Sequence, residues 1–152
     1  MSTKTTRNLL VTLLGFLGVG ALGGGGVLIV SPSGKLMGMP LSMLTGSPFN
    51  NFLVPGLILF TVLGVAPCLL AVALLKKPAS AFADRLNALD DMHWTWTGSI
   101  YVTFALVIWL QLQMVFLNAV SWLHTFYMLL ALAILGVALL PKVRAEYAKR
   151  QA

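Results

Sequence analysis

The sequence predicts an all-α membrane protein with four transmembrane helices, and three observations support this fold class. Hydrophobic residues make up 59% of the 152 residues and charged residues only 9%, whereas soluble domains carry roughly 25% charged residues. Four apolar segments, at about 9–30, 52–75, 96–116 and 120–140, contain no Asp, Glu, Lys or Arg. Each is long enough, at about 1.5 Å per residue, to cross a hydrocarbon core of about 30 Å. We therefore expect a single transmembrane domain over residues 1–152.

The first span, 9–30, is rich in glycine. Gly20 with Gly24, and Ala21 with Gly25, form small-xxx-small pairs, which allow a second helix to approach closely. We expect this face to pack inside the bundle, with a homodimer contact and a ligand against bare backbone as alternatives. Four consecutive glycines also favour a kink or a loosened turn near the end of the span. The basic start and small residues of the segment are compatible with a cleavable signal peptide, which is a further alternative.

A segment of mixed polarity, 31–56, separates the first two apolar runs, and its proline and glycine residues mark turns. Within it, 36–44 is apolar enough to form a short helix or a re-entrant segment at the membrane surface. We expect a structured extracytoplasmic loop that covers the bundle. In the second span, Pro67 lacks an N–H group and should kink the helix.

The polar segment between the second and third spans predicts a short cytoplasmic helix at the membrane interface. Phe82, Leu86 and Leu89 follow helical spacing, and charged residues occupy the other faces. Ser80 is a suitable N-cap for this helix. Docking of a partner protein to the helix is the alternative interpretation.

The third and fourth spans are joined only by residues 117–119, which predicts an antiparallel hairpin. Asn118 or Ser121 is available to cap the last helix. After this hairpin the chain closes with a basic tail.

The basic residues predict the orientation of the chain. With four spans, the N-terminus, the second loop and the C-terminus lie on one side and hold nine of the ten Lys and Arg residues; only Lys35 falls on the other side. Cytoplasmic segments of membrane proteins carry such an excess of positive charge. Both termini are therefore expected in the cytoplasm, and the segment 31–56 outside.

The sequence also argues against several function classes. The net charge of +6 comes from residues beside the span ends, where they contact anionic lipid headgroups, so we expect no nucleic-acid partner. Cys68 is the single cysteine and cannot form an internal disulfide or a redox pair. No acidic residue lies in a span, which argues against a proton-coupled exporter. His93 and His124 fall at opposite membrane faces, so we expect no metal and no cofactor.

The candidate ligand-binding residues lie in the outer half of the predicted bundle. Gln111 and Asn118 share one face of the third helix, while Gln113 points roughly 200° away from Gln111. A buried amide in hydrocarbon needs a hydrogen-bond partner. These groups either bond to one another or form the floor of an outward-facing pocket, and both interpretations stay open. The candidate set is Gln111, Asn118, His124, Tyr127, Ser47, Asn50 and Asn51.

Five stretches carry a resemblance to known proteins: SPSG, GMPLSMLTGSPFNNFLVPGLIL, HWTWTG, VIWLQLQ and LLPKVRAEY, in this order. With them the chain resembles a family of small, uncharacterised four-span proteins of the bacterial inner membrane, over nearly its whole length. The resemblance implies a bacterial cytoplasmic-membrane setting. It implies no activity and no site residues.

From these observations we expect a non-enzymatic membrane protein that packs against a partner or binds a lipid or other apolar ligand in the outer leaflet. Its expected partners are membrane lipids, with a homo-oligomer or a membrane-protein partner also open. One alternative is a subunit of a transport or secretion assembly, contacted through the glycine-rich span. The other is a lipid-modifying enzyme that uses His124. No carboxylate is visible in the sequence to orient this histidine, so we assign no catalytic residue.

Overall fold

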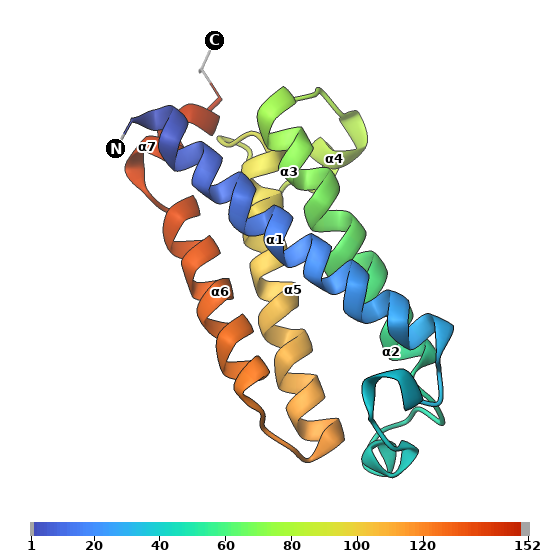
Figure 1. Ribbon diagram of the computed structural model, residues 1–152. Helices are drawn as coiled ribbons and strands as arrows, with labels where there is room; N and C mark the ends of the chain where they lie inside the picture. The colour runs from blue at the N-terminus through green and yellow to red at the C-terminus, as the bar shows by residue number, and fades with distance from the viewer. Residues whose placement is uncertain (1, 150–152) are drawn as a thin grey trace.

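The computed structural model describes residues 2–149, and within this range the protein is helical throughout (Figure 1). No β-strand occurs in these residues, although an isolated antiparallel bridge joins Met92 and Ala148. The elements in chain order are α1 (Thr3–Val30), η1 (Lys35–Met37), η2 (Leu41–Leu44), α2 (Leu53–Ile58), η3 (Leu59–Val65), α3 (Ala66–Lys76), α4 (Ala81–Arg85), α5 (Trp94–Leu117), α6 (Trp122–Ala138) and α7 (Pro141–Tyr147).

Three helices are long and apolar enough to cross a membrane, and a bent pair raises this number to four. The three are α1, the continuous segment Leu53–Lys76 and α5. The bent pair is α6 with α7, whose axes differ by 65°. The structure therefore confirms an all-helical fold, over the described residues, with three to four helices long and apolar enough to span a membrane.

The sequence predicts an irregularity in each of the first two spans, and the structure has a non-α segment only in the second. α1 is one uninterrupted α-helix through its four consecutive glycines, so no break forms where the sequence favours one. In the second span the irregularity is a π-helical segment, η3, directly before Pro67. A proline ring collides with the carbonyl group four residues earlier. The carbonyl group in question belongs to Leu63, which lies within the π-helical segment.

A seam of glycines joins α1 to the second span, and we call it the glycine seam: Gly18 and Gly25 from α1, Gly56 and Gly64 from α2 and η3. A Cβ atom on Gly25 would lie 2.7 Å from the backbone nitrogen of Phe60 and 2.8 Å from the carbonyl oxygen of Gly56. A Cβ atom on Gly64 would lie 2.9 Å from the Leu22 side chain. These distances leave no room for a side chain, so the two backbones pack directly against each other. This contact supports α1 along its glycine run, where the helix continues without interruption.

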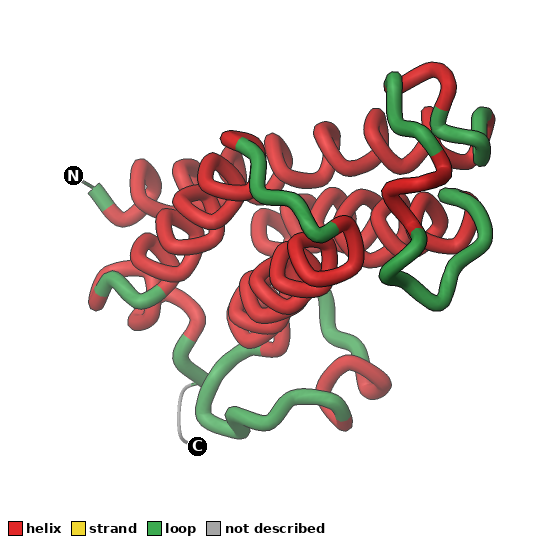
Figure 2. Tube along the Cα trace, turned by 90° about the horizontal axis from the view of Figure 1, so that it is seen from below, coloured by secondary structure: helices red, strands yellow, loops and turns green. Residues whose placement is uncertain are grey.

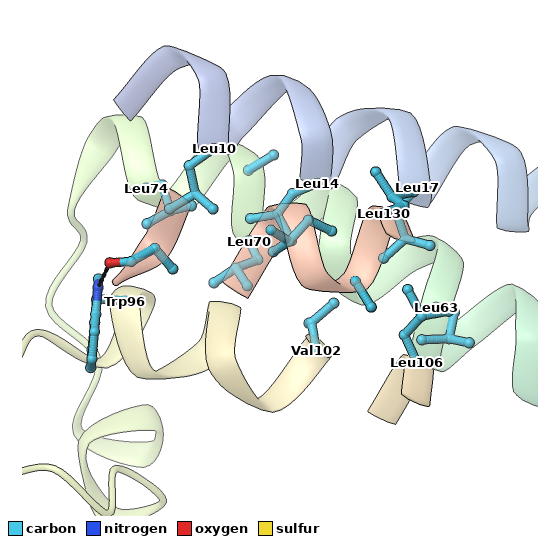
Figure 3. Close-up of a cluster of buried hydrophobic side chains, with 14 of the residues drawn as sticks. Leu10, Leu14, Leu17, Leu63, Leu70, Leu74, Trp96, Val102, Leu106 and Leu130 are labelled. Atoms are coloured by element: carbon cyan, nitrogen blue, oxygen red, sulfur yellow. Dashed lines mark hydrogen bonds between the residues drawn. The ribbon is translucent and has the colours of Figure 1, made fainter. Parts of the chain in front are cut away.

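Leucine side chains from α1 form the centre of the main core with partners from α3, η3, α5 and α6 (Figure 3). Leu10, Leu14 and Leu17 are almost completely buried there. At one end of this core the indole nitrogen of Trp96 donates a hydrogen bond of 2.8 Å to the carbonyl oxygen of Ala138, drawn as a dashed line in Figure 3. This bond ties the start of α5 to the end of α6.

α7 closes the end of the molecule at which both termini lie (Figure 1). The buried Tyr147 hydroxyl donates to the carbonyl oxygen of Leu74 at 2.7 Å. Glu146 pairs with Arg7 at 3.0 Å and with Lys77 at 3.4 Å, and the Lys77 ammonium lies 4.5 Å from the centre of the Tyr147 ring. The C-terminal segment is thus fastened to α1 and α3.

The predicted interfacial helix is present but shorter than its apolar spacing suggests. Ser80 caps α4 by accepting a hydrogen bond from the Ala83 backbone N–H, as the sequence predicts. The helix ends at Arg85, so Leu89 lies beyond it and the expected three-residue apolar stripe does not form on one helix. The reason is local: the Asn87 side chain donates to the carbonyl oxygen of Met92, which favours a turn over helix continuation.

The opposite end of the molecule carries the 31–52 loop and the link between α5 and α6. Figure 2, seen from below, shows the short helical turns of the loop gathered at one side of the bundle. Leu44 and Phe52 bury their side chains against Leu28 of α1. The loop is therefore packed onto the bundle. The short helix expected within 36–44 consists of two 3-10 turns, η1 and η2.

Candidate ligand cavity

The candidate site is a cavity of about 360 Å³ near the loop end of the bundle. α1 and the α5–α6 hairpin diverge toward this end (Figure 1), and the space that side chains leave between them forms the cavity. η3 and the loop supply the remaining walls. The lining comprises Leu17, Gly20, Ala21, Gly24, Leu28, Met37, Met39, Met43, Leu59, Leu63, Leu106, Trp109, Leu110, Gln113, Leu117, Ala119, Ser121, Leu123, His124 and Tyr127.

The wall contributed by α1 is formed by small residues. Gly20, Ala21 and Gly24 all line the cavity. A Cβ atom on Gly24 would meet only Leu59, at an ordinary contact distance of 3.6 Å from its Cδ2 atom. The absence of side chains at these positions therefore creates part of the space.

Tyr127 of α6 reaches across the cavity to α1. Its hydroxyl oxygen lies 2.9 Å from the place that a Cβ atom on Gly20 would occupy. Within the described residues this hydroxyl group forms no hydrogen bond with the protein. It is a polar group at the edge of an apolar space.

Trp109 and Gln113 lie one helical turn apart on α5 and face the same cavity. The indole nitrogen of Trp109 is buried and has no hydrogen-bond partner among the described residues. The same two side chains also line a smaller cavity of about 40 Å³ beneath the loop. They therefore separate the two spaces.

His124 lies in the first turn of α6, where its ring completes the N-terminal cap. Its Nδ1 atom accepts a hydrogen bond of 2.9 Å from the backbone N–H of Ser121. In the neutral ring the proton therefore resides on Nε2. No side-chain carboxylate orients this histidine, because the four acidic residues of the chain belong to α4, to the link between α4 and α5, and to α7, at the opposite end of the bundle (Figure 1): Asp84, Asp90, Asp91 and Glu146.

The loop wall of the cavity consists mainly of methionine. Met37, Met39 and Met43 contribute from the two 3-10 turns and from the link between them. Methionine side chains adapt to irregular apolar shapes. The rings of Phe49 and Phe116 meet edge to face, with their centres 6.1 Å apart, and fix the loop to the end of α5.

The structure brings together two of the side chains proposed from the sequence for ligand binding: His124 and Tyr127 both line the cavity. Gln111 does not line it and is exposed on the outer side of α5. Asn118 is also exposed and ends α5 in a left-handed conformation with φ of 45°. The expected floor of Gln111 and Asn118 is thus absent from the cavity lining.

The three loop residues of the candidate set, Ser47, Asn50 and Asn51, lie outside the cavity lining, and two of them form hydrogen bonds within the loop. The Ser47 hydroxyl donates to the carbonyl oxygen of Leu44 at 2.9 Å. The Asn51 side chain accepts from the backbone N–H of Leu53 at 3.0 Å, and Asn50 is exposed. None of the three lines the cavity.

The sequence reasoning did not place Trp109 in the site, and it considered Gln113 only as pointing away from Gln111. The opposite directions of the two glutamines could have identified the site. If Gln111 faces outward, then Gln113 faces inward, and so does Trp109 one helical turn before it. Comparison with protein-family models, with curated proteins and with solved structures gives no match, so the function is argued from this geometry.

Proposed function

We propose that the protein binds a lipid or another apolar ligand inside the membrane and catalyses no reaction. The observation that carries this proposal is the cavity of about 360 Å³, whose walls are almost entirely aliphatic, methionine or glycine. Pockets for small ligands span about 300–1,000 Å³ and are mostly apolar with a few polar groups. Trp109, Gln113, Ser121, His124 and Tyr127 supply the polar groups here.

We further propose a location and an orientation for the protein. It resides in the bacterial cytoplasmic membrane with four spans, the fourth being α6, and with both termini in the cytoplasm. In support, the described Lys and Arg residues other than Lys35 belong to segments at the end where the termini lie. Cytoplasmic loops favour such residues. The 31–52 loop and the cavity then belong to the outer leaflet.

Two neighbouring glycines provide a matched test of ligand binding. Gly24 faces the cavity, whereas a Cβ atom on Gly23 would meet nothing within 4 Å. A leucine at position 24 should fill the cavity, while a leucine at position 23 should project away from it. Both substitutions replace glycine in the same helix, so their effects on helix propensity are similar.

The measurement is native mass spectrometry of protein extracted from bacterial membranes in mild detergent. We expect the wild-type protein and Gly23→Leu to retain a bound lipid or apolar molecule, and Gly24→Leu to lose about nine-tenths of it, a free-energy change of about 1.4 kcal/mol. A wild-type protein that carries no such molecule, or equal retention by both variants, would contradict the proposal.

A further inference from the structure

We infer that the cavity selects an uncharged lipid whose head carries carbonyl oxygens, as an ester or a ketone does. This inference rests on the proposed function, because it specifies the ligand of the same cavity. It follows from the hydrogen-bonding groups and from the charges of the lining.

Three of the residues that line the cavity carry a hydrogen-bond donor without an acceptor among the described residues. The Trp109 indole N–H is buried and has no acceptor within the described residues. His124 uses Nδ1 as an acceptor in its helix cap, and its Nε2–H has no acceptor among residues 2–149. The Tyr127 hydroxyl has no partner in the described part of the chain either. Of the three donors only the Trp109 N–H is fully buried, where a missing acceptor is costly. His124 and Tyr127 are half-buried and line the cavity, so a ligand that supplies acceptor oxygens can accept from these two side chains.

The charges around the cavity argue against an ionic headgroup. No Lys, Arg, Asp or Glu belongs to its lining. An anionic headgroup would need a cation, but Lys35, the single basic residue in the loop, is exposed and lies outside the lining. A cationic headgroup would need a carboxylate, and the carboxylates lie toward the other end of the bundle. An unpaired charge in such surroundings is strongly unfavourable.

The shape of the cavity accommodates an apolar chain beside the head. Its other walls are apolar, from Leu59 and Leu63 of η3 to the bare backbone of Gly20 and Gly24 on α1. A volume of about 360 Å³ corresponds to roughly a dozen groups the size of a water molecule. The cavity therefore holds a carbonyl head and the first part of one chain, and the rest of the lipid extends into the membrane.

The test uses the full-length protein in phosphatidylcholine nanodiscs with a diacylglycerol that carries a photoreactive diazirine in one acyl chain. Crosslinked residues are identified by mass spectrometry. Unlabelled diacylglycerol, an isoprenoid quinone and phosphatidylglycerol then compete with the probe. We expect labelling of cavity residues, and competition by a neutral carbonyl lipid at about one-tenth of the concentration that phosphatidylglycerol requires. The stronger of the two neutral competitors identifies the source of the carbonyl group.

Three variants connect the selectivity to the donors. Trp109→Phe and Tyr127→Phe each remove one donor and should lower the preference for neutral carbonyl lipids about threefold to tenfold. Trp122→Phe is the matched control, because Trp122 is largely exposed at 73% on the outside of α6 and should leave the preference unchanged.

The outcomes separate this inference from the proposed function. Labelling of the cavity with equal competition by all lipids, or with preference for phosphatidylglycerol, would overturn the headgroup inference and leave lipid binding intact. A preference that survives both donor substitutions would overturn the role of Trp109 and Tyr127. Absence of any label in the cavity of the folded wild-type protein would overturn lipid binding itself.

Discussion

Two faces of α1 use the same residue type for opposite purposes. On one face, Gly18 and Gly25 belong to the glycine seam, where a side chain would strike atoms of the neighbouring span. On the other face, Gly20 and Gly24 line the cavity, where the neighbours of a side chain are the ends of other side chains. Ala21 is buried between the two faces and contributes to the cavity wall as well.

The difference shows that a missing side chain has two distinct structural effects. At the seam it allows the closest approach of two backbones, which supplies van der Waals contact where lipid offers no hydrophobic driving force. At the cavity it leaves space that the protein does not fill. The four glycines should therefore tolerate the same substitution to very different degrees.

Gly25→Ala should have the largest effect. The added Cβ atom would meet only backbone atoms, at 2.7 Å from the Phe60 nitrogen and 2.8 Å from the Gly56 oxygen, so the two spans must separate. Overpacking of this kind costs about 3 kcal/mol, and alanine recovers about 1 kcal/mol of helix propensity. We expect the free energy of unfolding to fall by about 2 kcal/mol, measured by reversible denaturation in mixed micelles.

Gly23→Ala is the control for this substitution, because its Cβ atom meets nothing within 4 Å. It should be neutral or slightly stabilising. If Gly25→Ala is as stable as this control, the glycine seam is not a tight contact and the comparison of the two faces fails.

Gly18→Ala should have an intermediate effect. The added Cβ atom would overlap the Sγ atom of Cys68 and would lie 2.9 Å from the carbonyl oxygen of Gly64. The sulfur can move but the carbonyl group cannot, so we expect a loss of about 1 kcal/mol in the free energy of unfolding. A further Cys68→Ala substitution removes the sulfur and should recover part of this loss.

A double-mutant cycle of Gly18→Ala and Cys68→Ala checks the explanation. The two changes should be non-additive by about 0.5–1 kcal/mol, because both act on one contact. Additive effects would show that Cys68 does not limit the space at Gly18.

The sequence was informative about the fold because most signals were local. The apolar lengths, the Ser80 cap and the short link before the last span are each visible within a short window. The structure contains the long apolar helices and the cap, but the link covers residues 118–121 instead of 117–119, because α5 continues through Leu117 and α6 begins at Trp122. The continuity of α1 through its four glycines could not be predicted in this way. It depends on Gly56 and Gly64, which are distant in sequence and become neighbours of α1 only after folding.

The cavity was harder to predict for a related reason. His124 and Tyr127 could be placed near the loop end because they follow a short link. The sequence does not determine which face of α5 points toward the bundle. Its residues are apolar on all sides, so periodicity does not distinguish an inward from an outward face. The sequence therefore favoured Gln111 as a pocket residue. In the structure Gln113 and Trp109 line the cavity and Gln111 does not.

Gly20→Ala should have the smallest effect on stability and still alter ligand binding. Its Cβ atom would lie 2.9 Å from the Tyr127 hydroxyl oxygen, which is the far end of a side chain that can rotate away. We expect the free energy of unfolding to change by less than about 0.5 kcal/mol, because the small clash and the gain in helix propensity offset each other. Displacement of the hydroxyl group should nevertheless weaken diacylglycerol competition about as much as Tyr127→Phe does.

The double variant Gly20→Ala, Tyr127→Phe should then bind diacylglycerol no more weakly than Tyr127→Phe alone, since both changes act on one hydroxyl group. A loss of stability equal to that of Gly25→Ala would instead mean that both faces of α1 are packed to the same tightness.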